Sequence, residues 1–142
     1  MKRKIIFRGK TIDNKRWVYG DLKIFEGCYI GYTIEIVHFD EGKQNSYIEV
    51  EVIPESVGQF TGFKTKNESF IYDESKEMYE GDIITKGGKN KYIIIYDEYG
   101  FRGISNEGDE YVPYSFNFKD GYDRDKLKIV GNITDNPELF KK

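Results

Sequence analysis

The sequence predicts a mainly β protein made of short antiparallel strands in two small lobes. β-Branched and aromatic residues, which favour strands, recur every few positions, and aromatic residues make up 16% of the chain. Fifteen glycines against three prolines suit strands that are joined by tight turns. Apolar and polar residues alternate in residues 46–53, as in a strand with one face in water.

The N-terminal β region, residues 1–63, is expected to contain five strands. They fall at residues 4–8, 16–19, 22–25, 29–39 and 46–53. Residues 9–15 form a turn around Asp13-Asn14, and residues 40–45 form a polar connection. After the last strand, Pro54 followed by Glu55 predicts a single helical turn.

The second half of the chain has a more regular spacing of strands and glycines. Residues 64–80 are polar and are expected to form a flexible connection. In the C-terminal region, residues 81–142, the expected strands are 83–86, 91–96, 101–105 and 127–133. Because closure removes exposed strand edges, we expect a small SH3-like, partly open barrel there. Asn136 and Pro137 then predict a terminal helical turn. A single compact unit is the alternative to two lobes.

Composition limits the class of protein. The chain has 142 residues, of which 38% are hydrophobic and 33% charged. Its single cysteine, Cys28, excludes an intramolecular disulfide, and residues 1–7 lack the apolar run of a secretory signal. No stretch approaches the ~18 apolar residues of a membrane span. We therefore expect a cytoplasmic protein without a membrane partner.

The charge is unevenly distributed along the chain. Residues 1–24 hold eight Lys or Arg against two Asp, a local charge of +6. Residues 26–80 hold four basic against twelve acidic residues, a local charge of −8. Such asymmetry favours a charged partner or a complementary contact between regions of the protein, although charged surface also serves solubility alone.

No pattern in the sequence predicts catalysis, a cofactor or a metal site. Gly9-Lys10-Thr11 lacks the upstream glycine of a phosphate-binding loop. His38 has no second histidine as a partner and is interpreted as a structural or surface residue, and Cys28 has no adjacent base and is interpreted as a small buried apolar residue. Residues 120–125 gather three carboxylates but lack the spacing of a calcium loop. The chain is predicted not to be an enzyme, although 25 acidic residues leave a catalytic carboxylate pair open.

The basic N-terminal segment carries the one candidate ligand site. Its cations lie beside Phe7, Trp17 and Tyr19, a mixture typical of single-stranded nucleic-acid binding. The candidate residues are Lys2, Arg3, Lys4, Arg8, Lys10, Lys15 and Arg16. The opposing interpretation is that the aromatic residues fill the core, and the acidic chain as a whole favours it.

Five blocks in order resemble the YopX family. They are Phe7-Arg8-Gly9-Lys10, Trp17-Val18-Tyr19-Gly20-Asp21-Leu22, Val57-Gly58-Gln59-Phe60-Thr61-Gly62, Tyr79-Glu80-Gly81-Asp82-Ile83-Ile84 and Val130-Gly131-Asn132-Ile133-Thr134-Asp135-Asn136-Pro137-Glu138-Leu139. The resemblance implies a mostly β protein of a phage or prophage, located in the bacterial cytoplasm, with no established activity. It names no catalytic residue.

Three hypotheses follow for what the chain binds. The first is a phage accessory protein that binds a host or phage protein through an aromatic-rich β surface, because large rings give contact area with little rotamer entropy to lose. The second is a nucleic-acid binding module that uses the basic N-terminal segment. The third is a homo-oligomer in which the basic segment of one copy meets the acidic middle of another.

Overall fold

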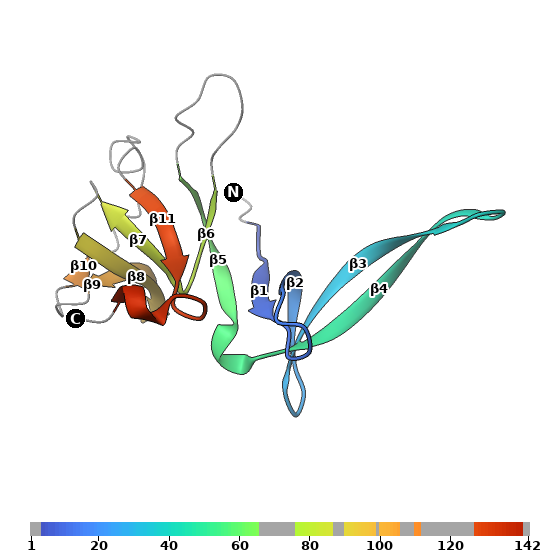
Figure 1. Ribbon diagram of the computed structural model, residues 1–142, viewed down its shortest axis with the longest axis horizontal. Helices are drawn as coiled ribbons and strands as arrows, with labels where there is room; N and C mark the ends of the chain where they lie inside the picture. Colours follow the sequence, from blue (N-terminus) through green and yellow to red (C-terminus); the bar gives the residue numbers. More distant parts are fainter. Residues whose placement is uncertain are drawn as a thin grey trace, which may run out of the picture. The chain divides into compact units, whose positions relative to one another are not determined.

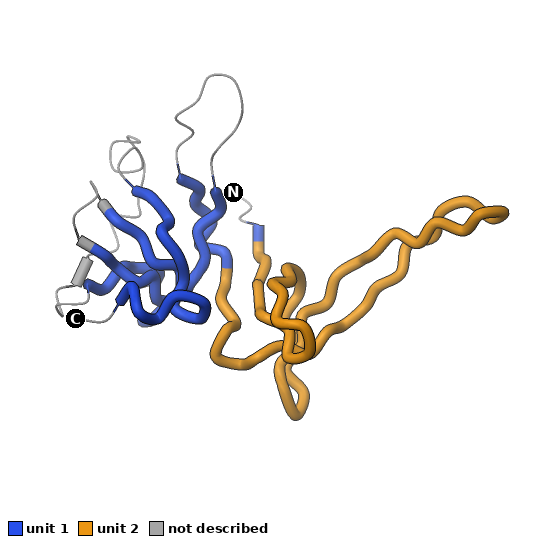
Figure 2. The backbone as a smooth tube through the Cα atoms, viewed as in Figure 1, with its two compact units in different colours: residues 1–4, 60–142 blue, residues 5–59 orange. Residues whose placement is uncertain are grey.

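The computed structural model describes residues 4–65, 76–86, 90–98, 100–105, 110–111 and 127–140. In these residues the regular structure is almost entirely antiparallel β, with two short 3-10 turns, so the predicted class is confirmed. The chain divides into two compact units, which Figure 2 distinguishes by colour. Unit 2 is Ile5–Gln59, and unit 1 is Lys4 with the described residues from Phe60 onward. The predicted division at residues 63 and 80 stays a prediction.

Unit 2 is built on four strands in the order β4-β3-β2-β1 (Figure 1). Their bounds are β1 Phe7–Lys10, β2 Trp17–Ile24, β3 Cys28–His38 and β4 Gly42–Val52. The first residues of β5, Gly58–Lys64, pair with the free side of β1. Three turns need a left-handed backbone, at Lys15 (φ 54°), Glu26 (φ 54°) and Gly42 (φ 83°). Only at the last does the sequence supply a glycine, for which that conformation carries no steric cost.

The core of unit 2 is a cluster of three buried aliphatic side chains, Val18, Ile30 and Val52. Partly buried residues around it are Phe7, Leu22, Cys28, Tyr32 and Val57. Cys28 thus packs as a small apolar residue, as the sequence suggested. Gly9 in β1 lies directly against the core, since a Cβ atom there would come within 2.8 Å of Val52 Cγ2.

The predicted helical turn at Pro54 is confirmed as η1, Pro54–Ser56. Ser56 ties this turn to β1, because its Oγ accepts a hydrogen bond from the Lys10 backbone N–H at 2.8 Å. The same hydroxyl donates to the Ile53 carbonyl oxygen at 2.6 Å. The buried Ser56 side chain therefore fixes the position of the chain after β4 relative to β1.

Unit 1 contains the rest of β5, which pairs with β6 (Glu77–Tyr79), and a five-stranded sheet in the order β10-β9-β8-β7-β11. Its strands are β7 Asp82–Lys86, β8 Asn90–Asp97, β9 Gly100–Ser105, β10 Glu110–Tyr111 and β11 Leu127–Asn132. In the described residues the sheet does not close into a barrel, because β10 and β11 are its two edges. The SH3-like likeness stays a prediction.

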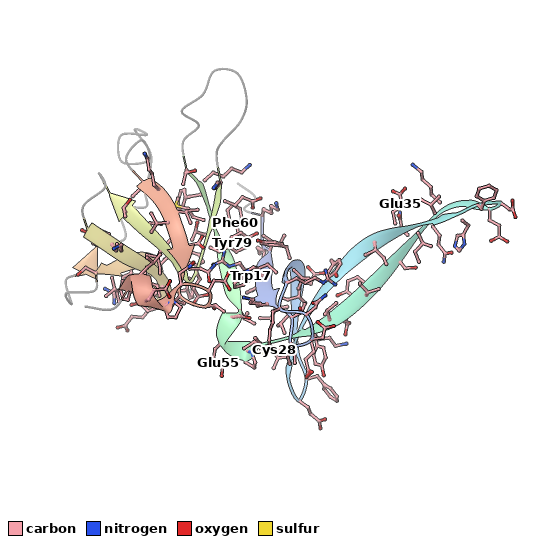
Figure 3. The ribbon with its side chains drawn as sticks, in the orientation of Figure 1. Trp17, Cys28, Glu35, Glu55, Phe60 and Tyr79 are labelled. Atoms are coloured by element: carbon pink, nitrogen blue, oxygen red, sulfur yellow. The ribbon has the colours of Figure 1, made fainter. Side chains whose placement is uncertain are left out.

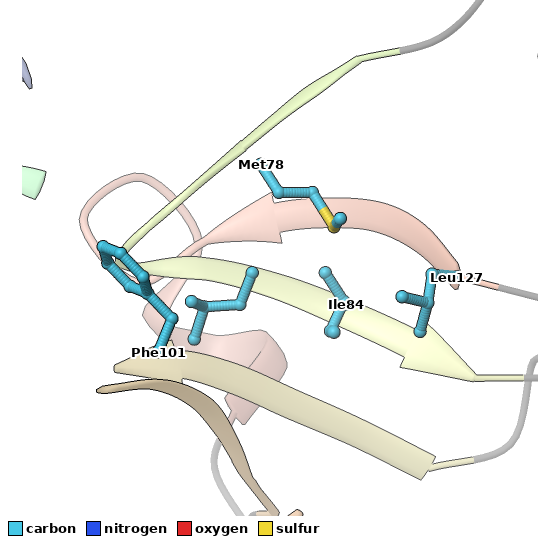
Figure 4. Close-up of a cluster of buried hydrophobic side chains, with 5 residues drawn as sticks. Met78, Ile84, Phe101 and Leu127 are labelled. Atoms are coloured by element: carbon cyan, nitrogen blue, oxygen red, sulfur yellow. The ribbon is translucent and has the colours of Figure 1, made fainter. Parts of the chain in front are cut away.

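The core of unit 1 lies on one face of this sheet. Figure 4 shows the buried cluster of Met78, Ile84, Ile94, Phe101 and Leu127. Ile84, Ile94 and Met78 are completely buried. Each such side chain contributes roughly 1.5–3 kcal/mol through its removal from water. Met78 comes from β6, so the predicted flexible connection, residues 64–80, supplies a core residue close to its end. Residues 66–75 of that connection lie outside the described part of the chain.

Short polar turns fix the strand ends of unit 1. The buried Asp82 accepts a hydrogen bond from the Tyr79 backbone N–H at 2.7 Å, and Gly81 between them has φ 95°. The terminal helical turn is confirmed as η4, Pro137–Phe140. The Asn136 side chain accepts from the Asn132 backbone N–H at 3.2 Å, so it ties the turn to the end of β11.

Candidate binding surface

The β3–β4 hairpin extends beyond the rest of the sheet of unit 2. The two strands have eleven residues each and pair without a register shift, from Cys28↔Val52 to His38↔Gly42. β2 pairs only with the first four residues of β3, as far as Gly31. From Tyr32 onward, the part of the chain that the structure describes places no strand beside the outer edge of β3 (Figure 1).

The two faces of this hairpin differ in chemistry. Because side chains alternate along a strand, the apolar residues gather on one face. They are Ile30, Tyr32, Ile34, Ile36, Ile48, Val50 and Val52. At the base of the hairpin Ile30 and Val52 are buried in the core of unit 2, whereas Ile36 near the tip is exposed. The apolar face is therefore buried at the base of the hairpin and exposed to water near its tip.

The tip of the hairpin exposes apolar side chains among acidic ones. Phe39 is fully exposed and Val37 is 69% exposed. Asp40 and Glu41 follow Phe39 directly, and all are exposed to water. The exposed phenyl ring of Phe39 adds no buried area to the core of unit 2. Figure 3 labels Glu35, which adds a further carboxylate on the distal part of β3.

Two ion pairs lie on the polar face of the sheet, one within the hairpin and one between the hairpin and β2. Lys43 Nζ lies 3.3 Å from Glu35 Oε1, and Lys23 Nζ lies 3.3 Å from Glu49 Oε1. The four side chains are between one third and three quarters exposed, so water screens both pairs. The two ion pairs contribute little to stability. They place positive and negative side chains alternately across the sheet.

The structure distributes the predicted nucleic-acid-binding residues over different surroundings. Lys2 and Arg3 lie outside the described residues. Lys4 belongs to unit 1, where its Nζ lies 3.5 Å from Glu77 Oε2. Arg8 is buried in unit 2, with its guanidinium carbon 4.8 Å from the centre of the Trp17 ring. The contact of Arg8 with Trp17 is a cation–π stack inside the protein.

The remaining three cations lie at one end of the β1–β2 hairpin. Lys10 pairs with Trp17 in the sheet, and Lys15 and Arg16 are exposed in the turn between the strands. Asp13 in the same turn reduces the positive charge. The Asn14 backbone N–H donates to its carboxylate and lowers the pKa of Asp13 from its ordinary value, which favours the charged form.

Other candidate chemistry does not converge in the described residues. His38 shares a hydrogen bond of 3.0 Å with the Gln44 side chain across the hairpin. No three of the described His, Cys, Asp and Glu residues form a group that would hold a metal ion. The described segments also include no helix long and apolar enough to cross a bilayer. The acidic residues 120–125 lie outside the described part of the chain.

A comparison with protein-family models identifies the family of the chain. The model for the YopX protein matches residues 6–141, nearly the entire sequence. The chain belongs to the YopX family. The resemblance seen in the sequence is thereby confirmed. A search of curated proteins gave no significant match.

In this YopX-family chain the family-like blocks are mainly scaffold. The Tyr79-Glu80-Gly81-Asp82 block forms the turn in which Asp82 accepts from Tyr79. In the last block Gly131 lies so close to the Asn136 side chain that a Cβ would come within 2.6 Å of its Oδ1. These residues shape turns and positions of close approach.

Sequence analysis missed the hairpin tip as a candidate surface. Residues 40–45 were expected to be a polar connection, yet β4 begins at Gly42. The available signal was Phe39 followed by Asp40-Glu41-Gly42, since an acidic residue before glycine between two apolar runs is typical of a hairpin turn. The equal lengths of the paired strands were not visible in the sequence.

Proposed function

We propose that this YopX-family chain is a non-enzymatic protein-binding module of a phage or prophage, and that it binds through the tip of the β3–β4 hairpin. The observation that carries the proposal is the exposure of Val37 and Phe39 at the end of a long, regular hairpin. A strand scaffold that holds an aromatic side chain away from its own core suits an anchor residue, since aromatic anchors dominate many interfaces.

The charge around the tip indicates the chemistry of the partner. Asp40 and Glu41 follow the exposed Phe39, whereas Lys43, opposite Val37 in the ladder, is the ion-pair partner of Glu35. The tip therefore keeps an excess of negative charge. A complementary surface is an apolar recess with a basic rim, because like charges at the rim are costly and opposite charges speed the encounter. The proposed partner is therefore a host or phage protein with such a recess.

Substitution at the tip tests this function. In Val37→Ser/Phe39→Ser we expect affinity for the captured protein to fall about 30-fold or more, because burial of each side chain is worth roughly 1.5–3 kcal/mol. The tagged chain is incubated with lysate from cells that carry its gene. The captured protein is then purified and titrated directly by calorimetry.

Ile24→Ser/Phe25→Ser is the matched control for this test. Both side chains are strongly exposed in the same unit, at the end of β2, so the change in overall hydrophobicity is the same in kind. We expect the control to bind like the wild type. Equal loss of binding in both double variants, or no protein whose capture depends on the tip, would contradict the proposal.

Nucleic-acid binding is the second candidate, favoured by Lys10, Lys15 and Arg16 at one end of the β1–β2 hairpin. Three phosphate contacts predict that log K falls against log salt with a slope of about −3 for duplex DNA and about −2 for a single strand. Fluorescence anisotropy of labelled oligonucleotides measures this slope. Lys15→Glu/Arg16→Glu is expected to abolish binding, and a slope near zero would remove this candidate.

A further inference from the structure

The outer edge of β4 is the second open feature of unit 2, and it is distinct from the tip. Among the described residues, the neighbours of β4 are β3 along its full length and, at its end, a bridge between Val52 and Thr11. Its outer edge is therefore open over residues 42–50. These described residues contain no proline and no bulge, and the charged side chains Lys43 and Glu49 are the features that protect the edge from pairing with an arbitrary strand.

The hydrogen bonds at the end of β4 show which backbone groups face outward. The Glu51 carbonyl oxygen accepts from the Ile12 N–H at 3.2 Å, and the Ile53 N–H donates to the Lys10 carbonyl oxygen at 2.8 Å. Because the N–H and C=O of one residue point to the same side of a strand and alternate with its neighbours, the odd-numbered residues face outward. At the open edge these are Lys43, Asn45, Tyr47 and Glu49.

We infer that this edge pairs with the same edge of a second copy, in an antiparallel arrangement around a two-fold axis at Ser46. The two ends of the open edge select this register. Gly42 begins the strand and the bridge at Val52 closes the far end, so full pairing of residues 42–50 in two copies is centred on Ser46. A two-fold axis makes such a contact self-complementary.

The register brings opposite charges together twice. Lys43 of each copy lies opposite Glu49 of the other, as a hydrogen-bonded pair. Lys43 and Glu49 already have ion-pair partners on the same face of their own copy, Glu35 and Lys23. The paired sheet therefore carries a row of alternating charges, Lys23, Glu49, Lys43 and Glu35, that runs from one copy into the next. A partner strand of arbitrary sequence lacks this match.

This inference does not depend on the proposed function, because the tip residues Val37 and Phe39 take no part in the edge. The proposed function and the inferred self-association can therefore be disproved independently of each other. Loss of partner binding in the tip variant leaves self-association unchanged, and loss of self-association in an edge variant leaves the tip intact.

Charge reversal tests the inference by sedimentation of the purified protein over a wide concentration range. In Lys43→Glu and in Glu49→Lys each two-fold contact faces a like charge, so self-association is expected to weaken about tenfold, equivalent to about 1.4 kcal/mol. An equimolar mixture of the two variants restores both contacts, as does the double variant Lys43→Glu/Glu49→Lys. Both are expected to associate like the wild type.

Glu55→Lys is the control for the change in net charge, since Glu55 is exposed in η1 of the same unit, beyond the open edge (Figure 3). Circular dichroism confirms that each variant is folded. Amide hydrogen exchange adds an independent readout, because the N–H groups of Asn45, Tyr47 and Glu49 gain protection with concentration while those of even-numbered neighbours stay protected throughout. A monomeric wild type, or a mixture no better associated than its components, would overturn the inference.

Discussion

Replacement of Ile84 by alanine is expected to lower the free energy of unfolding by about 2–5 kcal/mol. Ile84 lies in the middle of β7, is completely buried and packs in the cluster with Met78, Ile94, Phe101 and Leu127. The substitution removes apolar atoms from a site whose neighbours come from several strands. These neighbours are held by the sheet and cannot collapse fully into the cavity, so both the lost burial and the cavity are costly.

Urea denaturation followed by circular dichroism measures this effect. Val130→Ala is the control, because Val130 lies in β11, the strand that pairs with β7, but stands at the register shift of that ladder and is exposed. Substitutions at exposed positions usually change stability by within about 0.5 kcal/mol. A loss of less than about 1 kcal/mol for Ile84→Ala would show that unit 1 does not depend on this cluster.

Local signals in the sequence were sufficient for the two 3-10 turns. Pro54 with Glu55, and Asn136 with Pro137, predicted the two 3-10 turns because proline fixes φ near the value that a helical start requires. Gly100, the first residue of β9, has φ 94°, a conformation that glycine adopts without steric cost. These features depend on one or two residues, so a single sequence contains all the information they need.

Pairing between strands was the main limit of the prediction. Lys43, Gln44 and Asn45 have weak strand preference, yet they belong to β4 because β3 offers a full ladder of hydrogen bonds opposite them. The same reason applies to Glu77–Tyr79, which form β6 beside β5 within a polar segment. Such residues become strand through a partner that is distant in sequence.

The candidate surface was harder to predict than the fold, because it depends on which face each strand buries. In β1, Arg8 is buried against Trp17, although the basic residues around it in the sequence predicted an exposed basic segment. At the tip, Phe39 is of a residue type that is usually buried in a core, yet it is fully exposed. Composition identifies residue types, and only the sheet register decides their surroundings.

Gly20→Ala is expected to have the second large effect, a loss of about 3 kcal/mol or more from the free energy of unfolding. Gly20 in β2 lies against the backbone of Gly31 in β3. A Cβ atom at position 20 would overlap the Gly31 carbonyl oxygen and come within 2.9 Å of its carbonyl carbon. A backbone group cannot rotate away as a side chain does, so β2 and β3 would have to separate where the long hairpin begins.

Two further glycines give a graded comparison for this prediction. A Cβ at Gly31 would overlap the hydroxyl oxygen of Tyr47, the mobile end of a side chain, so Gly31→Ala should cost less than Gly20→Ala. At Gly27 the nearest atom is Glu51 Oε1 at 3.2 Å, and Gly27→Ala should cost least. Fluorescence of Trp17, the single tryptophan, follows unit 2 during denaturation. Equal stability of the three variants would contradict the close approach of β2 and β3. It would also contradict tight packing of these strands at the base of the β3–β4 hairpin.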